Sequence, residues 1–69
     1  LVPAPAEIAL KEARDARARG DDGAAEKSLG QALALDPSFD AARIDLVQLL
    51  LDRGDTAAAR GHWSLLSGR

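Results

Sequence analysis

The sequence contains no cysteine, methionine or tyrosine, and it has one phenylalanine, one tryptophan and one histidine among its 69 residues. Without cysteine, disulfides, thiol chemistry and Cys-ligated zinc sites are excluded. The single His62 cannot form a metal site alone, and no pattern in the sequence supplies a nucleophile or an orienting group for it as a general base. We therefore expect no enzymatic activity, no metal and no cofactor.

Positive charge and long apolar runs are also scarce. The formal net charge is −2, so the chain lacks the basic field that holds phosphates, and nucleic acid is not an expected partner. The longest apolar run, residues 32–35, falls far short of the roughly 20 residues that span a bilayer. We expect no membrane partner either, and we predict a cytoplasmic protein.

What remains is a single small domain with a thin core. The hydrophobic fraction is 46%, but alanine accounts for much of it, and small side chains bury little area. The chain opens with Leu1 and carries Pro3 and Pro5, which is typical of a linker cut from a longer protein. We predict a linker remnant over residues 1–5, a domain over residues 6–67 and a tail at residues 68–69.

A repeat organises this domain. The residues Arg19-Gly20-Asp21 recur as Arg53-Gly54-Asp55, and an Ala-Ala pair follows each triplet at the same spacing, so the two copies lie 34 positions apart. The match predicts two copies of one unit, over residues 6–39 and 40–67.

Helix signals are placed as two helical units require. Pro5 suits a first helical position, and Gly20 can close a helix near residue 19. Asp21 or Asp22 then caps a second helix, which cannot continue through Pro37.

The second unit repeats these signals. Ser38 offers an N-cap for a third helix that closes at Gly54, and Asp55 caps a fourth. Three residues of the fourth helix recur at i, i+4 and i+7, the spacing of a buried face: Ala59, Trp63 and Leu66. The sequence therefore predicts an all-α chain of four antiparallel helices, with Trp63 in the core.

A 34-residue unit of helix, Gly-Asp turn and second helix ended by Asp-Pro resembles the tetratricopeptide repeat family. The family's structural positions fall on Gly20, Ala25, Leu29, Ala32, Pro37, Gly54, Ala59 and Trp63. The resemblance implies a short right-handed α-solenoid. In the first helix the large family residues are replaced mainly by alanines, so we expect this helix to be weakly held.

At a finer level, the Pro-rich entry, the Ala-rich first unit and residues 41–60 resemble the C-terminal repeats of bacterial thioredoxin-like chaperedoxins. This resemblance implies a preceding thioredoxin-like domain and a partner that is a chaperone or an unfolded client. None of the thioredoxin residues is present in the sequence, so it implies no redox activity here.

The family resemblance also implies a concave binding face, lined by the first helix of each unit. The residues expected there are Leu10, Arg14, Arg17, Ile44, Gln48, Leu51 and Asp52. Such a face suits a peptide with leucine-like anchors and a carboxylate that an arginine can bind. The alternative is that the two arginines only solvate a helix face. A second hypothesis for function is self-association, because a stable stack usually needs at least three repeats.

Overall fold

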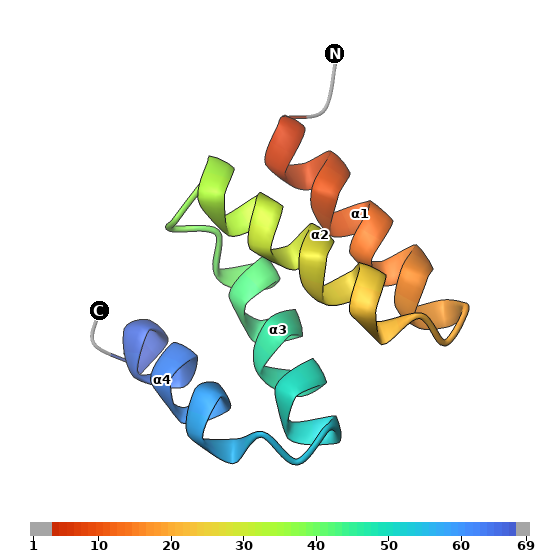
Figure 1. Ribbon diagram of the computed structural model, residues 1–69. Coiled ribbons are helices and arrows are strands. Elements are labelled where there is room, and N and C mark those ends of the chain that lie inside the picture. The colour runs from red at the N-terminus through yellow and green to blue at the C-terminus, as the bar shows by residue number, and fades with distance from the viewer. Residues whose placement is uncertain (1–3, 68–69) are drawn as a thin grey trace.

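The computed structural model describes residues 4–67, and this part of the chain forms four α-helices (Figure 1). They are α1 (Pro5–Ala18), α2 (Asp22–Leu35), α3 (Asp40–Asp52) and α4 (Thr56–Ser67). α1 and α2 form one antiparallel hairpin, α3 and α4 form a second, and α2 packs against α3 where the hairpins meet. The predicted all-α architecture of two helical units is confirmed. Residues 1–3 and 68–69, which hold most of the predicted linker and the predicted tail, lie outside the described residues.

The turns inside the two hairpins have the same geometry. Gly20 and Gly54 have positive φ angles of 81° and 82°. The amide of Asp21 donates to the carbonyl of Ala16 at 2.9 Å, and the amide of Asp55 donates to the carbonyl of Leu50 at 2.8 Å. A glycine of positive φ with this long-range amide bond is the Schellman ending of a helix. The repeat seen in the sequence is therefore a repeat of backbone structure.

Aspartate caps follow both turns. Asp21 Oδ1 accepts a hydrogen bond from the amide of Ala24 at 3.1 Å, and Asp55 Oδ1 accepts one from the amide of Ala58 at 3.2 Å. Each bond satisfies an amide that has no partner inside its helix. The Arg-Gly-Asp triplets are thus explained by a helix ending followed by a helix start.

The start of α3 differs from the prediction, because Ser38 is not its N-cap. The capping position is Phe39, whose side chain makes no capping hydrogen bond. Ser38 instead donates to Asp36 Oδ1, from its amide at 3.1 Å and from Oγ at 2.8 Å. The Ser38 hydroxyl is thus hydrogen-bonded within the turn that precedes α3.

Alanine and leucine dominate the core, as composition predicted. The largest fully buried side chains are Leu29 and Leu49, while α1 contributes Leu10 and several alanines. The members of the core cluster are Ala9, Leu10, Ala13, Ala16, Ala25, Leu29, Ala32, Ala42, Leu46, Val47, Leu49, Leu50 and Ala59. This set includes the predicted structural positions 25, 29, 32 and 59. No helix within residues 4–67 has the length and apolar character needed to cross a bilayer.

Candidate binding surface

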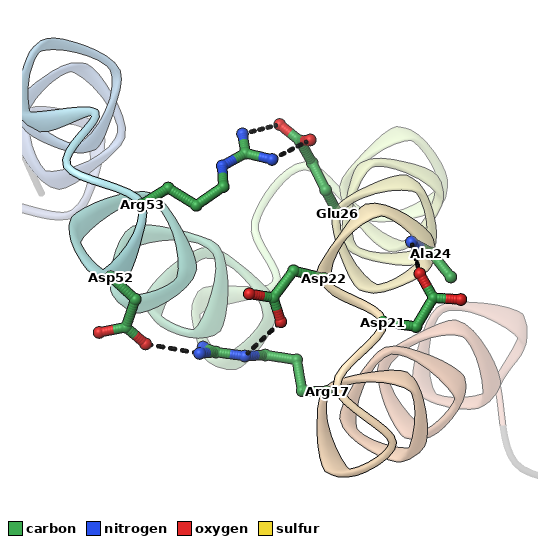
Figure 2. A network of polar contacts seen from close by, with 7 residues as sticks. All are labelled: Arg17, Asp21, Asp22, Ala24, Glu26, Asp52 and Arg53. Carbon is green, nitrogen blue, oxygen red and sulfur yellow. Dashed lines mark hydrogen bonds and ion pairs between the residues drawn. The ribbon is translucent and has the colours of Figure 1, made fainter.

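Ion pairs from α1 to α3 join the two hairpins. Arg14 Nε donates to Asp45 Oδ2 at 2.8 Å. Arg17 Nη2 donates to Asp52 Oδ2, and Arg17 Nε lies 3.6 Å from Asp22 Oδ1 (Figure 2). The hydrogen bonds to Asp45 and Asp52 are the main reason that the pKa values of Arg14 and Arg17 are raised above their ordinary range. Both arginines are therefore charged and engaged within the protein.

A further pair joins α2 to the end of α3. Arg53 Nη1 and Nη2 donate to the two carboxylate oxygens of Glu26, each at 2.9 Å (Figure 2). This bidentate geometry holds both side chains in one orientation. The hydrogen bonds raise the pKa of Arg53 and lower the pKa of the Glu26 carboxyl. The pair links α2 to the C-terminal end of α3.

These contacts change the interpretation of the predicted concave face. A ligand carboxylate would compete with Asp45 and Asp52 for Arg14 and Arg17, so the two arginines are paired cations and not free ones. Leu10 was expected to line the face, but it is 6% exposed and belongs to the core. Leu10 therefore lies in the core and not on an exposed face.

The second hairpin carries an open apolar groove between α3 and α4, with a volume of about 510 Å³. Three of the predicted binding residues, Ile44, Gln48 and Leu51, lie on its α3 side. The complete lining is Ile44, Val47, Gln48, Leu51, Thr56, Ala59, Arg60 and Trp63. We call this surface the α3/α4 groove.

Equivalent positions of the two hairpins show why this groove is open. Leu10 and Leu29 of the first hairpin are 6% and 0% exposed, whereas their counterparts 34 residues later, Ile44 and Trp63, are 44% and 55% exposed. α3 packs on the first hairpin, and no helix within residues 4–67 packs on the second in the same way. The expectation that Trp63 is a core residue was therefore wrong.

Arg60 is the one charged residue of the groove lining. Among the described residues its side chain takes part in no hydrogen bond and no ion pair. A guanidinium at the edge of an apolar surface can bind a carboxylate of a ligand in a bidentate manner. Arg60 is thus the cation available to a partner, in place of Arg14 and Arg17.

Arg43 and His62 form a polar cluster on another face of α3. Arg43 is more than nine-tenths buried, and its Nη2 donates to the carbonyl of Pro37 at 2.9 Å. Its Nη1 lies 3.0 Å from His62 Nδ1. Within the described part of the chain, the buried Nε of Arg43 has no hydrogen-bond partner. His62 therefore ties α4 to the start of α3.

Chemistry beyond binding has little support in the described structure. Between residues 4 and 67 there is no group of three or more His, Cys, Asp or Glu residues that could hold a metal ion. The groove lining offers contact area, one cation and two neutral polar side chains, which together suit recognition of a protein segment.

The sequence interpretation did not place five members of the groove lining in a binding surface: Val47, Thr56, Ala59, Arg60 and Trp63. A signal was present in the 34-residue alignment. It pairs Arg60 with Glu26 and Trp63 with Leu29, which are positions that the following helix contacts or covers in the first unit. Within residues 4–67 no helix packs on the same positions of the second unit.

A family model described as tetratricopeptide repeat matches residues 16–62, which is more than half of the chain. The chain belongs to the tetratricopeptide repeat family. The match runs from the last turn of α1 into α4, so it leaves out the part of α1 in which alanines replace the large residues of the family pattern. Tetratricopeptide repeats generally mediate contacts between proteins. No curated protein and no solved structure matches the chain, so the predicted likeness to chaperedoxins gains no support.

Proposed function

We propose that the chain is a protein-interaction module that binds a segment of a partner protein in the α3/α4 groove. One observation carries this proposal: positions of the first hairpin that α3 covers have exposed apolar counterparts in the second. Exposed residues of this size that line a common groove are typical of a protein-binding site. Membership of the tetratricopeptide repeat family supports the same general role.

The internal ion pairs favour this groove over the predicted arginine face. Asp45 and Asp52 already pair with Arg14 and Arg17. The sequence predicted Ile44, Gln48 and Leu51 as binding residues, and the proposal keeps this role for them. They line the groove together with residues of α4 instead of α1. A peptide bound there would contact the second hairpin only.

The proposal is tested by selecting ligands from a random-peptide display library on the immobilised chain. Selected peptides should lose about tenfold or more in affinity for Leu51→Gln, because burying a leucine side chain contributes about 1.5–3 kcal/mol. Leu35→Gln is the matched control, since Leu35 is equally exposed but lies on α2, outside the groove. It should leave binding unchanged.

A third variant separates the two candidate surfaces. The double substitution Arg14→Gln/Arg17→Gln should leave peptide affinity unchanged, with circular dichroism used to verify that the helices persist. If this variant abolishes binding while Leu51→Gln preserves it, the ligand occupies the arginine face and the groove is the wrong site.

The chaperedoxin resemblance suggests a finer form of the proposal, in which the partner is a chaperone or an unfolded client. The apolar groove suits exposed leucine-like segments of such a client. Chemically unfolded proteins should then compete with the selected peptides for the parent chain. Failure to compete would reject this form and leave the general role standing.

Self-association is the alternative function, because a second copy could also cover the exposed apolar residues. Sedimentation across a range of concentrations distinguishes the two. A chain that stays monomeric and helical when it binds peptides supports the interaction module, whereas a dimer that dissociates on Leu51→Gln supports self-association.

A further inference from the structure

The first hairpin of this chain already shows how such a groove receives a helix. α3 packs against α2 and forms ion pairs with α1 through one stripe of its surface. The stripe includes Asp45, Asp52 and Arg53, which form the ion pairs, and Leu46 and Leu49, which are buried in the core. A helix with leucines three residues apart and a charged residue four positions after the second leucine therefore fits the first hairpin.

A shift of 34 residues transfers this arrangement to the second hairpin. The covered positions Leu10 and Leu29 become the exposed Ile44 and Trp63. The backbone turn between the helices is the same in both hairpins. A helix placed on the α3/α4 groove as α3 lies on the first hairpin would cover its apolar floor.

The charges around the two grooves differ. Arg14 and Arg17, which bind the aspartates of α3, correspond to Gln48 and Leu51. Glu26, which binds Arg53, corresponds to Arg60. An incoming helix would therefore face the neutral Gln48 and Leu51 at the positions where α3 faces two arginines. It would face the cation Arg60 at the position where α3 faces the carboxylate of Glu26.

Resting on the proposed function, we propose that the α3/α4 groove binds an amphipathic helix of a partner protein with the pattern Leu-x-x-Leu-x-x-Leu-Glu. The first two leucines take the places that Leu46 and Leu49 have on α3. The third leucine takes the place of Asp52 and faces Leu51, the counterpart of Arg17. The glutamate takes the place of Arg53 and binds Arg60, the counterpart of Glu26. The groove thus selects an acidic helix by a reversal of the charge pair in the first hairpin.

A second copy of the chain fits this groove poorly. If it stacked through α1, Glu12 and Asp15 would stand where Leu46 and Leu49 stand on α3, so two carboxylates would face the apolar floor. Arg19 would stand in the place of Arg53 and face Arg60, and like charges repel. Pairing of two identical grooves would bring no carboxylate from either lining to Arg60. A second copy of the chain is therefore not the occupant that this groove favours.

Two synthetic helices test the proposal directly. Both carry the sequence of residues 40–53 with Asp52→Leu; the acidic peptide also carries Arg53→Glu, while the basic peptide keeps Arg53. A hydrocarbon staple replaces the side chains at positions 44 and 48, on another face of the peptide, because isolated helices of this length are marginal in water. Neither peptide contains tryptophan, so the emission of Trp63, the one tryptophan of the chain, reports occupancy of the groove.

The acidic peptide should bind the parent chain about fivefold more tightly than the basic peptide, since one exposed ion pair replaces one repulsive contact. Arg60→Glu should reverse this preference, and Leu51→Gln should weaken both peptides. An unchanged preference on Arg60→Glu, or the absence of binding by both stapled peptides, would overturn the proposal. Dimerisation of the parent that Leu51→Gln abolishes would overturn it as well, because the groove would then bind a second copy.

The library selection distinguishes failure of this inference from failure of the proposed function. If the selected peptides depend on Leu51 but lack the leucine and glutamate pattern, the groove is a binding site and only the acidic-helix assignment is wrong. If no selected peptide depends on Leu51, the proposed function itself fails.

Discussion

The buried guanidinium of Arg43 depends on one histidine. Arginine can only donate hydrogen bonds, so the contact between Nη1 and His62 Nδ1 requires that Nδ1 accepts and that the imidazole carries its proton on Nε2. The same guanidinium holds the carbonyl of Pro37, in the turn between the hairpins. His62 therefore acts on stability through the position of Arg43, and not through a ligand.

Substitution of His62 tests this contact. We expect His62→Ala to lower the free energy of unfolding by about 1–3 kcal/mol, because it leaves a buried charged donor without an acceptor. Arg60→Ala, on the same helix but with an exposed side chain, should change it by less than about 0.5 kcal/mol. Urea unfolding of both variants measures the difference.

A double-mutant cycle identifies the cause. In an Arg43→Met background the donor is absent, so His62→Ala should cost less than it does in the parent. An equal cost in both backgrounds would show that His62 stabilises α4 without the help of Arg43.

The pair of Glu26 and Arg53 predicts a dependence of stability on pH. Its hydrogen bonds lower the pKa of Glu26 below the ordinary value of 4.5, so the pair stabilises the fold fully above that value. The contribution is lost as the pH falls below 4.5 and through the lowered pKa of the folded state. The thermal midpoint of the parent should therefore fall more steeply in this acidic range than that of Glu26→Gln. Parallel curves for the two proteins would show that the pair contributes nothing to stability in solution.

At the scale of elements, the helix endings are set by local chemistry. Gly20 has a φ of 81°, where a side chain is strained even though a Cβ there would meet nothing within 4 Å. Gly30 lies inside α2, where an added Cβ also meets nothing within 4 Å. The two glycines differ in backbone conformation and not in available space, so they form a matched pair.

We expect Gly20→Ala to lower the free energy of unfolding by about 1–2 kcal/mol, the cost of a left-handed conformation for a residue with a side chain. Gly30→Ala should raise it by about 1 kcal/mol, because alanine is the better helix former. In a domain of this size, a change of 1 kcal/mol moves the thermal midpoint by about 4–8 °C. A loss of stability in Gly30→Ala would reveal that another helix approaches α2 closely in solution.

The dependence of helix ends on local chemistry explains which features the sequence could predict. The ends of α1 and α3 and the aspartate caps depend on residues close in the chain, so the Gly-Asp signals located them correctly. Ser38 failed as a cap because Asp36, two residues away, accepts its hydrogen bonds. Whether Ser38 caps the helix is decided by local geometry that a residue pattern does not contain.

At the scale of the whole molecule, coverage by neighbouring helices decides which residues are core. Leu29 and Trp63 occupy the same position of the repeat, and the family pattern predicts a buried side chain for both. Whether each is buried depends on the helix that packs outside it, which is present for Leu29 and absent from residues 4–67 for Trp63. The candidate groove could not be predicted from the periodicity of α4 alone, because that periodicity is the same for a covered and an uncovered helix.

This dependence on coverage gives the two equivalent residues different energetic roles. A chain of this size has a total stability of about 3–10 kcal/mol at the usual value per residue. Leu29→Ala creates a cavity in the fully buried core and should cost about 2–5 kcal/mol, a large share of that total. Trp63→Ala removes a larger side chain but leaves no closed cavity, so it should cost less than Leu29→Ala. Urea unfolding of the monomeric variants measures both losses.

Equal losses would mean that Trp63 is packed as tightly as Leu29 in solution, and that the α3/α4 groove is already covered there. Alternatively, Trp63→Ala costs less than Leu29→Ala in the free chain, and the difference in the free energy of unfolding between the parent and Trp63→Ala grows when the acidic stapled peptide is added. This result would show that the tryptophan stabilises mainly the complex.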